Sequence, residues 1–195
     1  MTDRRTDSWQ GYDFVGGHIA LDLVNTVSWR LDAAKLVDRY QLPGFLPLWL
    51  TRAGLVRDDA GSSEIVTALT GLRETVYRLL VAPDRADVAR FAGYLTAARR
   101  RAVAEPSLPL RWTVPIERPD DVVHALAIAA DELLVSPDAA LVRQCSGKGC
   151  GWLFIDRTRN HSRQWCSSKD CGNRERARRH YRRTGKSRAT TVEDP

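Results

Sequence analysis

Three stretches of the chain repeat their apolar residues at the spacing of one helical face. The first follows Ser62 and Ser63, either of which can cap a helix, and its apolar residues are Ile65, Ala68, Leu69, Leu72, Val76 and Leu79. The second is capped by Asp84 and places on one face Val88, Phe91, Ala92 and Leu95. The third opens at Pro119 and ends before Ser136-Pro137, with apolar residues Val123, Leu126, Ala130 and Leu133. These patterns predict three amphipathic helices.

Other segments give shorter signals. Residues 14–27 contain two glycines and then an almost continuous apolar run, which fits either a short buried strand or the first turns of a helix. Residues 45–53 predict a short helix that Gly54 ends. Residues 110–116 alternate between apolar and polar and predict a strand, which Pro115 would confine to a sheet edge. The pattern as a whole predicts an α+β fold with a mainly helical, mixed N-terminal domain and a small sheet.

The composition and the lengths of the apolar runs indicate where in the cell the protein is expected. The chain has 195 residues and is 43% hydrophobic, which is enough for a buried core. It contains no apolar run of about 18 residues that could cross a membrane, and its first residues lack the apolar segment of a secretory signal. We therefore expect a cytoplasmic protein without a membrane partner. Because the cytosol is reducing, cysteines there are available to bind metal.

Charge is distributed unevenly along the chain. Residues 1–142 carry 16 Lys and Arg against 19 Asp and Glu, whereas residues 143–195 carry 14 against 5. The net charges are therefore −3 and +9. Such a contrast indicates a basic module that meets a polyanion, and the alternative is a solvated basic terminus without a partner.

All four cysteines lie within this basic part, as two pairs in the pattern C-x4-C-x15-C-x4-C: Cys145, Cys150, Cys166 and Cys171. Two close pairs joined by a longer insert are typical of a four-thiolate zinc site, since each pair supplies half of a tetrahedron. Four thiolates leave no open position for water, so the expected role of the Zn²⁺ is structural. Disulfides or unrelated buried thiols are the alternatives, and His161 is a competing ligand.

The insert and the second pair predict the rest of the module. Residues 152–155 and 163–165 would form the two strands of a hairpin around a polar turn at 156–161. Ser167 or Ser168 would cap a helix that begins near the second pair. Strand pair followed by a ligand-bearing helix is the order of a treble-clef zinc finger. Ala177 and Tyr181 form the less charged face of this helix, and we expect them to pack on the hairpin.

The predicted helix is rich in arginine. Arg174, Arg178 and Arg182 share one face, and a neighbouring row consists of Arg179, Arg183 and Lys186. The turn adds Arg157, Arg159 and Arg163. Guanidinium groups favour bidentate contacts to phosphate or guanine, so these nine residues are the predicted DNA-binding set. Arg174 has a structural alternative, because so close to the metal its guanidinium could bind hairpin carbonyls instead.

A family resemblance covers nearly the whole chain. The string Cys171-Gly-Asn-Arg174, preceded by Trp165-Cys166-Ser167, resembles the signature of the CGNR zinc-finger proteins. Residues 21–26, LDLVNT, and the helices after them are similar to the ABATE domain that precedes the finger in that family. The resemblance implies a bacterial transcription regulator with an α/β N-terminal domain of its own fold and a treble-clef-type finger that binds DNA.

The N-terminal domain offers few candidates for chemistry. The sequence contains no nucleophile elbow, P-loop, GxGxxG or HExxH motif, and we expect no enzyme. Four residues could line an effector pocket: His18, Asp22, Asn25 and Trp29. A turn at His18, bracing by Asp22 and Asn25, and core packing by Trp29 are the alternatives.

These observations define a domain plan and a function. Residues 1–138 would form the ABATE-like domain, which would bind an effector or form a homodimer, residues 139–188 the zinc finger, and residues 189–195 a disordered tail. The expected function is a DNA-binding transcription regulator that presents its arginine-rich helix to duplex DNA. The alternatives are an adaptor that binds an acidic protein and an RNA-associated factor.

Overall fold

The computed structural model describes residues 12–55 and 65–189, with side chains as far as Thr184. Its α-helices are α1 (Ile19–Val24), α2 (Phe45–Arg52), α3 (Val66–Val81), α4 (Arg85–Arg99), α5 (Pro119–Val135) and α6 (Asn173–Ala189). Two short 3-10 helices, η2 (Arg39–Gln41) and η3 (Pro137–Leu141), and one π-helical turn, η4 (Ser168–Gly172), connect them. The strands are short: β1 (Val27–Ser28), β2 (Val37–Asp38), β3 (Val103–Glu105), β4 (Arg111–Thr113), β5 (Val142–Gln144) and β6 (Leu153–Ile155). The mainly helical α+β prediction is confirmed.

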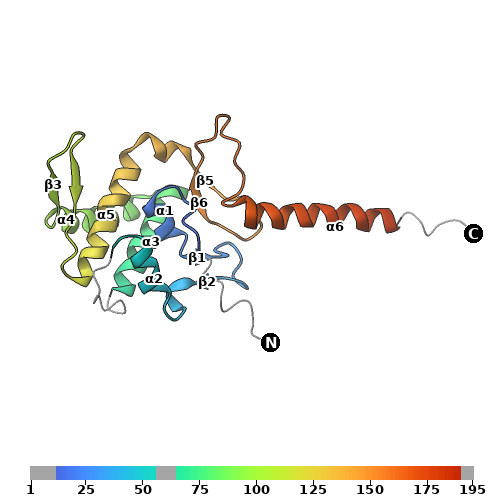
Figure 1. Cartoon of the computed structure of the whole chain (residues 1–195), viewed down its shortest axis with the longest axis horizontal. Coiled ribbons are helices and arrows are strands. Elements are labelled where there is room, and N and C mark those ends of the chain that lie inside the picture. The colour runs from blue at the N-terminus through green and yellow to red at the C-terminus, as the bar shows by residue number, and fades with distance from the viewer. Residues whose placement is uncertain (1–11, 56–64, 190–195) are drawn as a thin grey trace, which may run out of the picture.

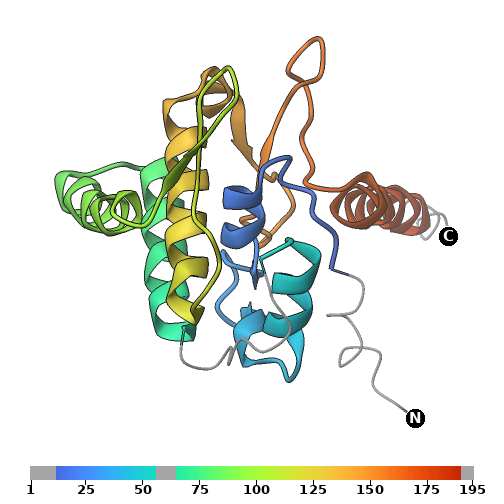
Figure 2. The ribbon, with the colours of Figure 1, turned by 60° about the vertical axis from the view of Figure 1, so that its left-hand side comes forward.

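The three amphipathic helices are α3, α4 and α5, and they build the core of the N-terminal domain. α3 and α5 run side by side, and α4 crosses them (Figure 2). Leu69, Leu72 and Leu126 are fully buried between them. The Oδ1 of Asp84 accepts a hydrogen bond from the amide of Asp87 at 2.7 Å, which confirms the predicted cap of α4. The serines predicted to cap α3 lie outside the described residues.

The ambiguous segment 14–27 forms a helix. Gly17, at φ 81°, turns the chain, and the ring of His18 accepts a hydrogen bond from the amide of Ala20 at 3.3 Å as the N-cap of α1. α1 contacts both α3 and α5, and Ala20, Leu21 and Leu23 are fully buried. Because α1 is covered on nearly every side, its sequence carries no amphipathic period, which explains why the pattern could not distinguish helix from strand.

The strands form three separate antiparallel ribbons: β1 with β2, β3 with β4, and β5 with β6. The strand predicted at 110–116 is confirmed as β4, and its partner β3 was not predicted. The shortness of β3 explains the omission, since Val103, Ala104 and Glu105 are too few to show an alternating pattern. None of the described helices is both long and apolar enough to cross a membrane.

α6 projects away from the rest of the molecule (Figure 1). Tyr181 on this helix is 73% exposed, and Ala177 is exposed as well. The expectation that these two residues pack on the hairpin is therefore wrong. The physical reason is the direction of the helix, which leaves the hairpin at its first turn. Of the tail predicted at 189–195, Ala189 instead ends α6, and residues 190–195 lie outside the described part of the chain.

Candidate metal centre and basic surface

The four cysteine thiols converge on one point. Their Sγ atoms all lie within 4.8 Å of one another, and every one of the four residues is buried. The Sγ atoms of Cys150 and Cys166 are 3.8 Å apart, and those of Cys166 and Cys171 are 3.5 Å apart. A tetrahedron with Zn–S bonds of about 2.3 Å separates its sulfurs by about 3.8 Å, so this donor set fits Zn²⁺. All four are free cysteines, and the disulfide alternative is excluded.

A tight hairpin loop between β5 and β6 carries the first pair of ligands. The Sγ of Cys145 accepts hydrogen bonds from the amides of Gly147 at 3.4 Å and Cys166 at 3.3 Å. A Cβ at Gly147 would lie 2.9 Å from the Sγ of Cys171, so a larger residue would intrude on the metal site. Two amide donors to one sulfur stabilise its negative charge and so favour the thiolate that a metal requires.

The second pair flanks the turn that starts α6. Cys166 ends the returning segment, and Cys171 lies in η4 just before α6. Ser167 occupies the N-cap position of η4 but makes no side-chain cap hydrogen bond, so the capping prediction for Ser167 is wrong. The carbonyl of the other candidate, Ser168, instead accepts a hydrogen bond from Arg176.

The hairpin differs from its prediction in one strand. β6 confirms residues 152–155, but it pairs with β5, which precedes Cys145, with Gln144 opposite Leu153. The returning residues 163–165 form no strand, although the carbonyl of Gln164 accepts a hydrogen bond from the amide of Ser146 at 2.9 Å. The carboxylate of Asp156 holds the loop between Thr158 and Arg163 in this course. It accepts hydrogen bonds from the hydroxyl and amide of Thr158 and from the amide of Arg163. These hydrogen bonds, led by that of the Thr158 hydroxyl, lower the pKa of Asp156.

His161 is a turn residue, not a ligand. It has a φ of 45°, and its Nδ1 lies 3.0 Å from the carbonyl oxygen of Asp156. The exposed His161 lies outside the cluster of four thiols.

The four candidates for an effector pocket lie near the joint between the N-terminal domain and the cysteine hairpin. The side chain of Asn25 is fully buried and exchanges two hydrogen bonds with the backbone of Leu153, at 2.8 and 2.9 Å. The Oδ1 of Asp22 accepts a hydrogen bond from the amide of Gly16 at 2.9 Å, and the carbonyl of Gly16 accepts one from the amide of Ile155. The polar atoms of these two residues therefore brace the fold, which is the alternative predicted for them.

The other two candidates are also engaged. His18 caps α1, and burial, aided by the nearby Arg157, lowers its pKa. Burial raises the pKa of Asp22 to about 7. The indole of Trp29 lies beneath the guanidinium of Arg174, whose Cζ is 4.5 Å from the ring centroid.

Two family models match the chain. The CGNR zinc finger model matches residues 142–184. The ABATE model, described as "Putative stress-induced transcription regulator", matches residues 17–137. The chain belongs to the ABATE family. A search of curated proteins found no match. The two models occur in the predicted order, and the four cysteines form the structural zinc centre of the CGNR finger.

Each residue of the CGNR string has a structural role. Cys171 is a ligand, and a Cβ at Gly172 would lie 3.4 Å from the Cδ1 of Trp165. Asn173 donates a hydrogen bond to the carbonyl of Lys169 at 2.7 Å and braces the first turn of α6. Arg174 donates to the Sγ of Cys171 at 2.8 Å and pairs with Asp170 at 2.7 Å. Its charge therefore offsets that of the thiolates, which is a structural role but not the predicted binding of hairpin carbonyls.

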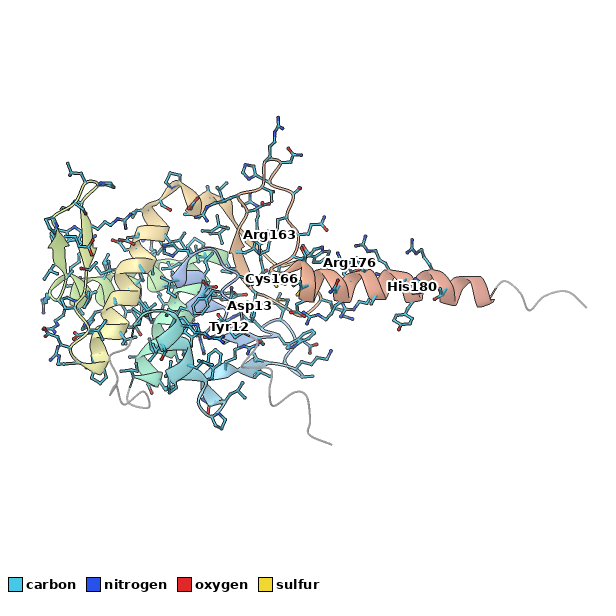
Figure 3. The ribbon with its side chains drawn as sticks, in the orientation of Figure 1. Tyr12, Asp13, Arg163, Cys166, Arg176 and His180 are labelled. Atoms are coloured by element: carbon cyan, nitrogen blue, oxygen red, sulfur yellow. The ribbon has the colours of Figure 1, made fainter. Side chains whose placement is uncertain are left out.

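Arg163 holds the CGNR finger together. Its guanidinium donates to the carbonyls of Trp165, Cys166 and Val15, and its Cζ lies 4.1 Å from the ring centroid of Phe154. Figure 3 shows Arg163 close to Cys166 at the root of α6. This is the carbonyl-binding role that was predicted as the alternative for Arg174. Its Nε and Nη2 therefore donate within the fold, and contact of Arg163 with DNA stays a prediction.

The remaining predicted arginines are more accessible. Arg157 pairs with Asp138 at 2.6 Å, whereas Arg178 and Arg182 pair with Glu175 at 3.6 and 3.1 Å. Among the described side chains, Arg159 on the 156–162 loop and Arg179 on α6 are exposed and have no acidic partner. The side chain of Lys186 lies outside the described residues.

A basic groove runs along α6, lined by Arg176, Arg179, Arg182 and Arg183. Arg176, which is not among the predicted DNA-binding residues, also donates to the carbonyl of Ser168 and the side chain of Asn173. Its spacing of three and seven residues from Arg179 and Arg183 is the signal that could have identified it. In Figure 3 the labelled Arg176 and His180 extend from the projecting helix.

Proposed function

We propose that this ABATE protein is a transcription regulator that binds duplex DNA through α6 and the 156–162 loop. The observation that carries the proposal is the direction of α6, which begins at the zinc centre and projects away from the ABATE domain (Figure 1). Beyond its first turn, most of its described arginines are exposed. Exposed guanidinium groups on a projecting helix suit a polyanion. The proposal includes no catalytic activity.

The dimensions support a duplex as the partner. α6 has 17 residues, which at a rise of about 1.5 Å per residue makes it about 25 Å long. The major groove of B-DNA is about 12 Å wide and admits a single helix with its side chains. The exposed guanidinium groups around α6 would reach phosphates on both sides of the groove or guanine edges on its floor.

The individual arginines would contribute differently. Arg159 and Arg179 would contact phosphate directly, since neither has an acidic partner among the described residues. Arg178 and Arg182 would exchange the partly exposed Glu175 for phosphate, which costs little because ion pairs at the protein surface contribute only about 0–1 kcal/mol. Arg163 and Arg174 would chiefly support the finger.

Fluorescence anisotropy with a labelled duplex over a salt series would test the proposal. If about six phosphates are neutralised, the logarithm of the affinity should fall with the logarithm of salt concentration at a slope of about −5. The triple variant Arg159→Gln, Arg179→Gln, Arg182→Gln should reduce the slope by about 3 units and weaken binding about 100-fold near 0.1 M salt.

A matched triple variant on the ABATE domain serves as the control: Arg85→Gln, Arg100→Gln and Arg111→Gln remove the same charge from exposed positions. This control should bind like the wild type. Equal effects of the two triples, or an affinity no greater than that of an unstructured basic peptide, would reject DNA binding. Stronger binding to an acidic protein would then favour the adaptor alternative, and preference for single-stranded RNA would favour the third.

A further inference from the structure

A loop of the ABATE domain, Trp29–Asp32, packs directly on the zinc-binding hairpin. The amide of Arg30 donates to the carbonyl of Cys150 at 3.1 Å, and that of Leu31 donates to the carbonyl of Gly149 at 3.2 Å. A Cβ at Gly149 would lie 2.8 Å from the Cβ of Asp32. Gly149 also has a φ of +77°, so both its conformation and its surroundings favour glycine. This close fit makes the loop part of the metal centre's surroundings.

The loop reaches the root of α6 through one side chain. Trp29 has a φ of 56°, an uncommon conformation for a bulky residue that often marks a functional position. Its indole faces the Arg174 guanidinium, which also donates to Cys171 Sγ and pairs with Asp170. A continuous chain of contacts therefore joins the ABATE domain to the first turn of α6.

Ion pairs anchor the loop on its other side. Arg30 pairs with Glu74 on α3, and its guanidinium lies 4.2 Å from the ring centroid of Tyr77. Arg73, also on α3, pairs with Asp38 at the end of the β1–β2 ribbon at 2.7 Å. Because the Arg73 side chain is buried, these contacts fix the loop relative to the long helix α3.

α6 itself receives little other support. Beyond its first turn the described side chains are mostly exposed, and the helix packs chiefly against η4. A helix held only at its root acts as a lever: for a length of about 25 Å, a change of about 10° in direction moves the far end by about 4 Å. Such a shift is larger than the donor–acceptor distance of a hydrogen bond, so it would misplace side chains relative to base edges.

We propose that Trp29 is a positioning residue for DNA recognition, which sets the direction of α6 by holding Arg174 from the ABATE side. The inference rests on the proposed function and deepens it, because it assigns the ABATE domain a direct part in sequence discrimination. Phosphate attraction depends on the charges of α6, which Trp29 does not alter. Base recognition depends on the direction of α6, and Trp29 does affect that direction.

The variant Trp29→Gly isolates the ring, because glycine adopts the left-handed conformation without strain. A duplex site would first be selected from random-sequence DNA with the zinc-loaded wild type. Trp29→Gly should bind this site about 3-fold to 30-fold more weakly, the range of one cation–π contact, while keeping the wild-type affinity and salt slope on an unrelated duplex. Trp29→Phe should restore most of the discrimination because it keeps an aromatic face. Trp112→Ala, half-exposed on β4, is the remote control.

A second readout does not depend on DNA: the rate at which zinc passes from the protein to a coloured chelator. Without Trp29 to hold Arg174 against the Cys171 thiolate, release should be faster. Zinc content should remain one per chain. Faster release together with lost discrimination supports the proposal. Wild-type discrimination in Trp29→Gly would overturn it, whatever the release rate. If the wild type binds no duplex, the proposed function fails, and a faster release from Trp29→Gly would still support the Trp29–Arg174 contact.

Discussion

The ABATE domain and the CGNR finger are stabilised by different physical means. In the ABATE domain, α1, α3 and α5 bury aliphatic residues such as Leu21, Leu72 and Leu126 with no exposed surface at all. In the finger, the buried cluster consists of the four cysteines and Phe154, with Val15, Trp152 and Trp165 packed against it. Apolar burial therefore accounts for the first region. In the finger, Leu153 and Ile155 of β6 join that apolar core, and metal–thiolate bonds must account for the rest. The comparison predicts that each region responds to a different perturbation.

Loss of a zinc ligand should have the largest effect, and it should be confined to the finger. Cys166→Ser removes one of four thiolates, so the finger should lose its zinc, its order and its DNA binding, because metal binding and folding are coupled in such small sites. The measurements are zinc content, DNA anisotropy and far-ultraviolet circular dichroism. Most of the helical signal should remain, since α3, α4 and α5 lie outside the finger.

Ser168→Ala, an exposed change two residues away, is the control and should keep one zinc per chain. Collapse of the whole helical spectrum in Cys166→Ser would contradict the idea that the two regions are stabilised separately.

A cavity in the ABATE core should have the opposite effect: it should destabilise the ABATE domain and leave the zinc site intact. Leu126→Ala on α5 should lower the free energy of unfolding by about 2–5 kcal/mol, because it deletes three buried carbons and leaves a cavity. Urea unfolding followed by circular dichroism measures the loss. Zinc content under native conditions should stay at one per chain. Val135→Ala on the same helix changes a residue that is 77% exposed and should be nearly neutral.

Asp22 sharpens the comparison, because it lies at the seam between the two regions. Burial raises its pKa to about 7, so the folded protein binds a proton there that the unfolded chain releases near pH 4. The free energy of unfolding should therefore fall as pH rises from about 4 to 7, by up to about 4 kcal/mol if the full shift is expressed.

Asp22→Asn keeps an oxygen acceptor for the amide of Gly16 and removes the charge, so its stability should vary less over this pH range and exceed that of the wild type near pH 8. Chemical denaturation at several pH values measures the difference. Asp13→Asn, at an exposed position nearby, should keep the wild-type dependence. Parallel curves for Asp22→Asn and the wild type would reject this role for Asp22.

Several features were predictable because they depend on local chemistry. The periods of α3, α4 and α5 reflect one buried face each, and Asp84 signalled the start of α4 through its own hydrogen bond. The cysteine spacing identified the zinc ligands, since thiolates in two close pairs carry their chemistry with them. Residues 14–27 were harder, because complete burial of α1 removes the contrast on which periodicity depends.

The roles of the arginines were less predictable. Arg163 and Arg174 belong to the same basic sequence as Arg159 and Arg179, yet the first two bind carbonyls or thiolate and the last two face solvent. Local sequence shows that a guanidinium is present but not which acceptors surround it. The pairing of β6 with β5 was missed for a similar reason, since strand partners are set by the path of the chain between them.

The helical periods, the four zinc ligands and the positive charge after residue 142 could all be predicted from the sequence. Each of these depends on residue type and on spacing of a few positions. The folded structure was needed to show that α6 projects into solvent, that Asn25 braces Leu153 across 128 positions, and that Trp29 faces Arg174. These contacts join residues far apart in the chain, and they form because burial of the ABATE core brings the loop at residue 29 against the zinc-binding hairpin.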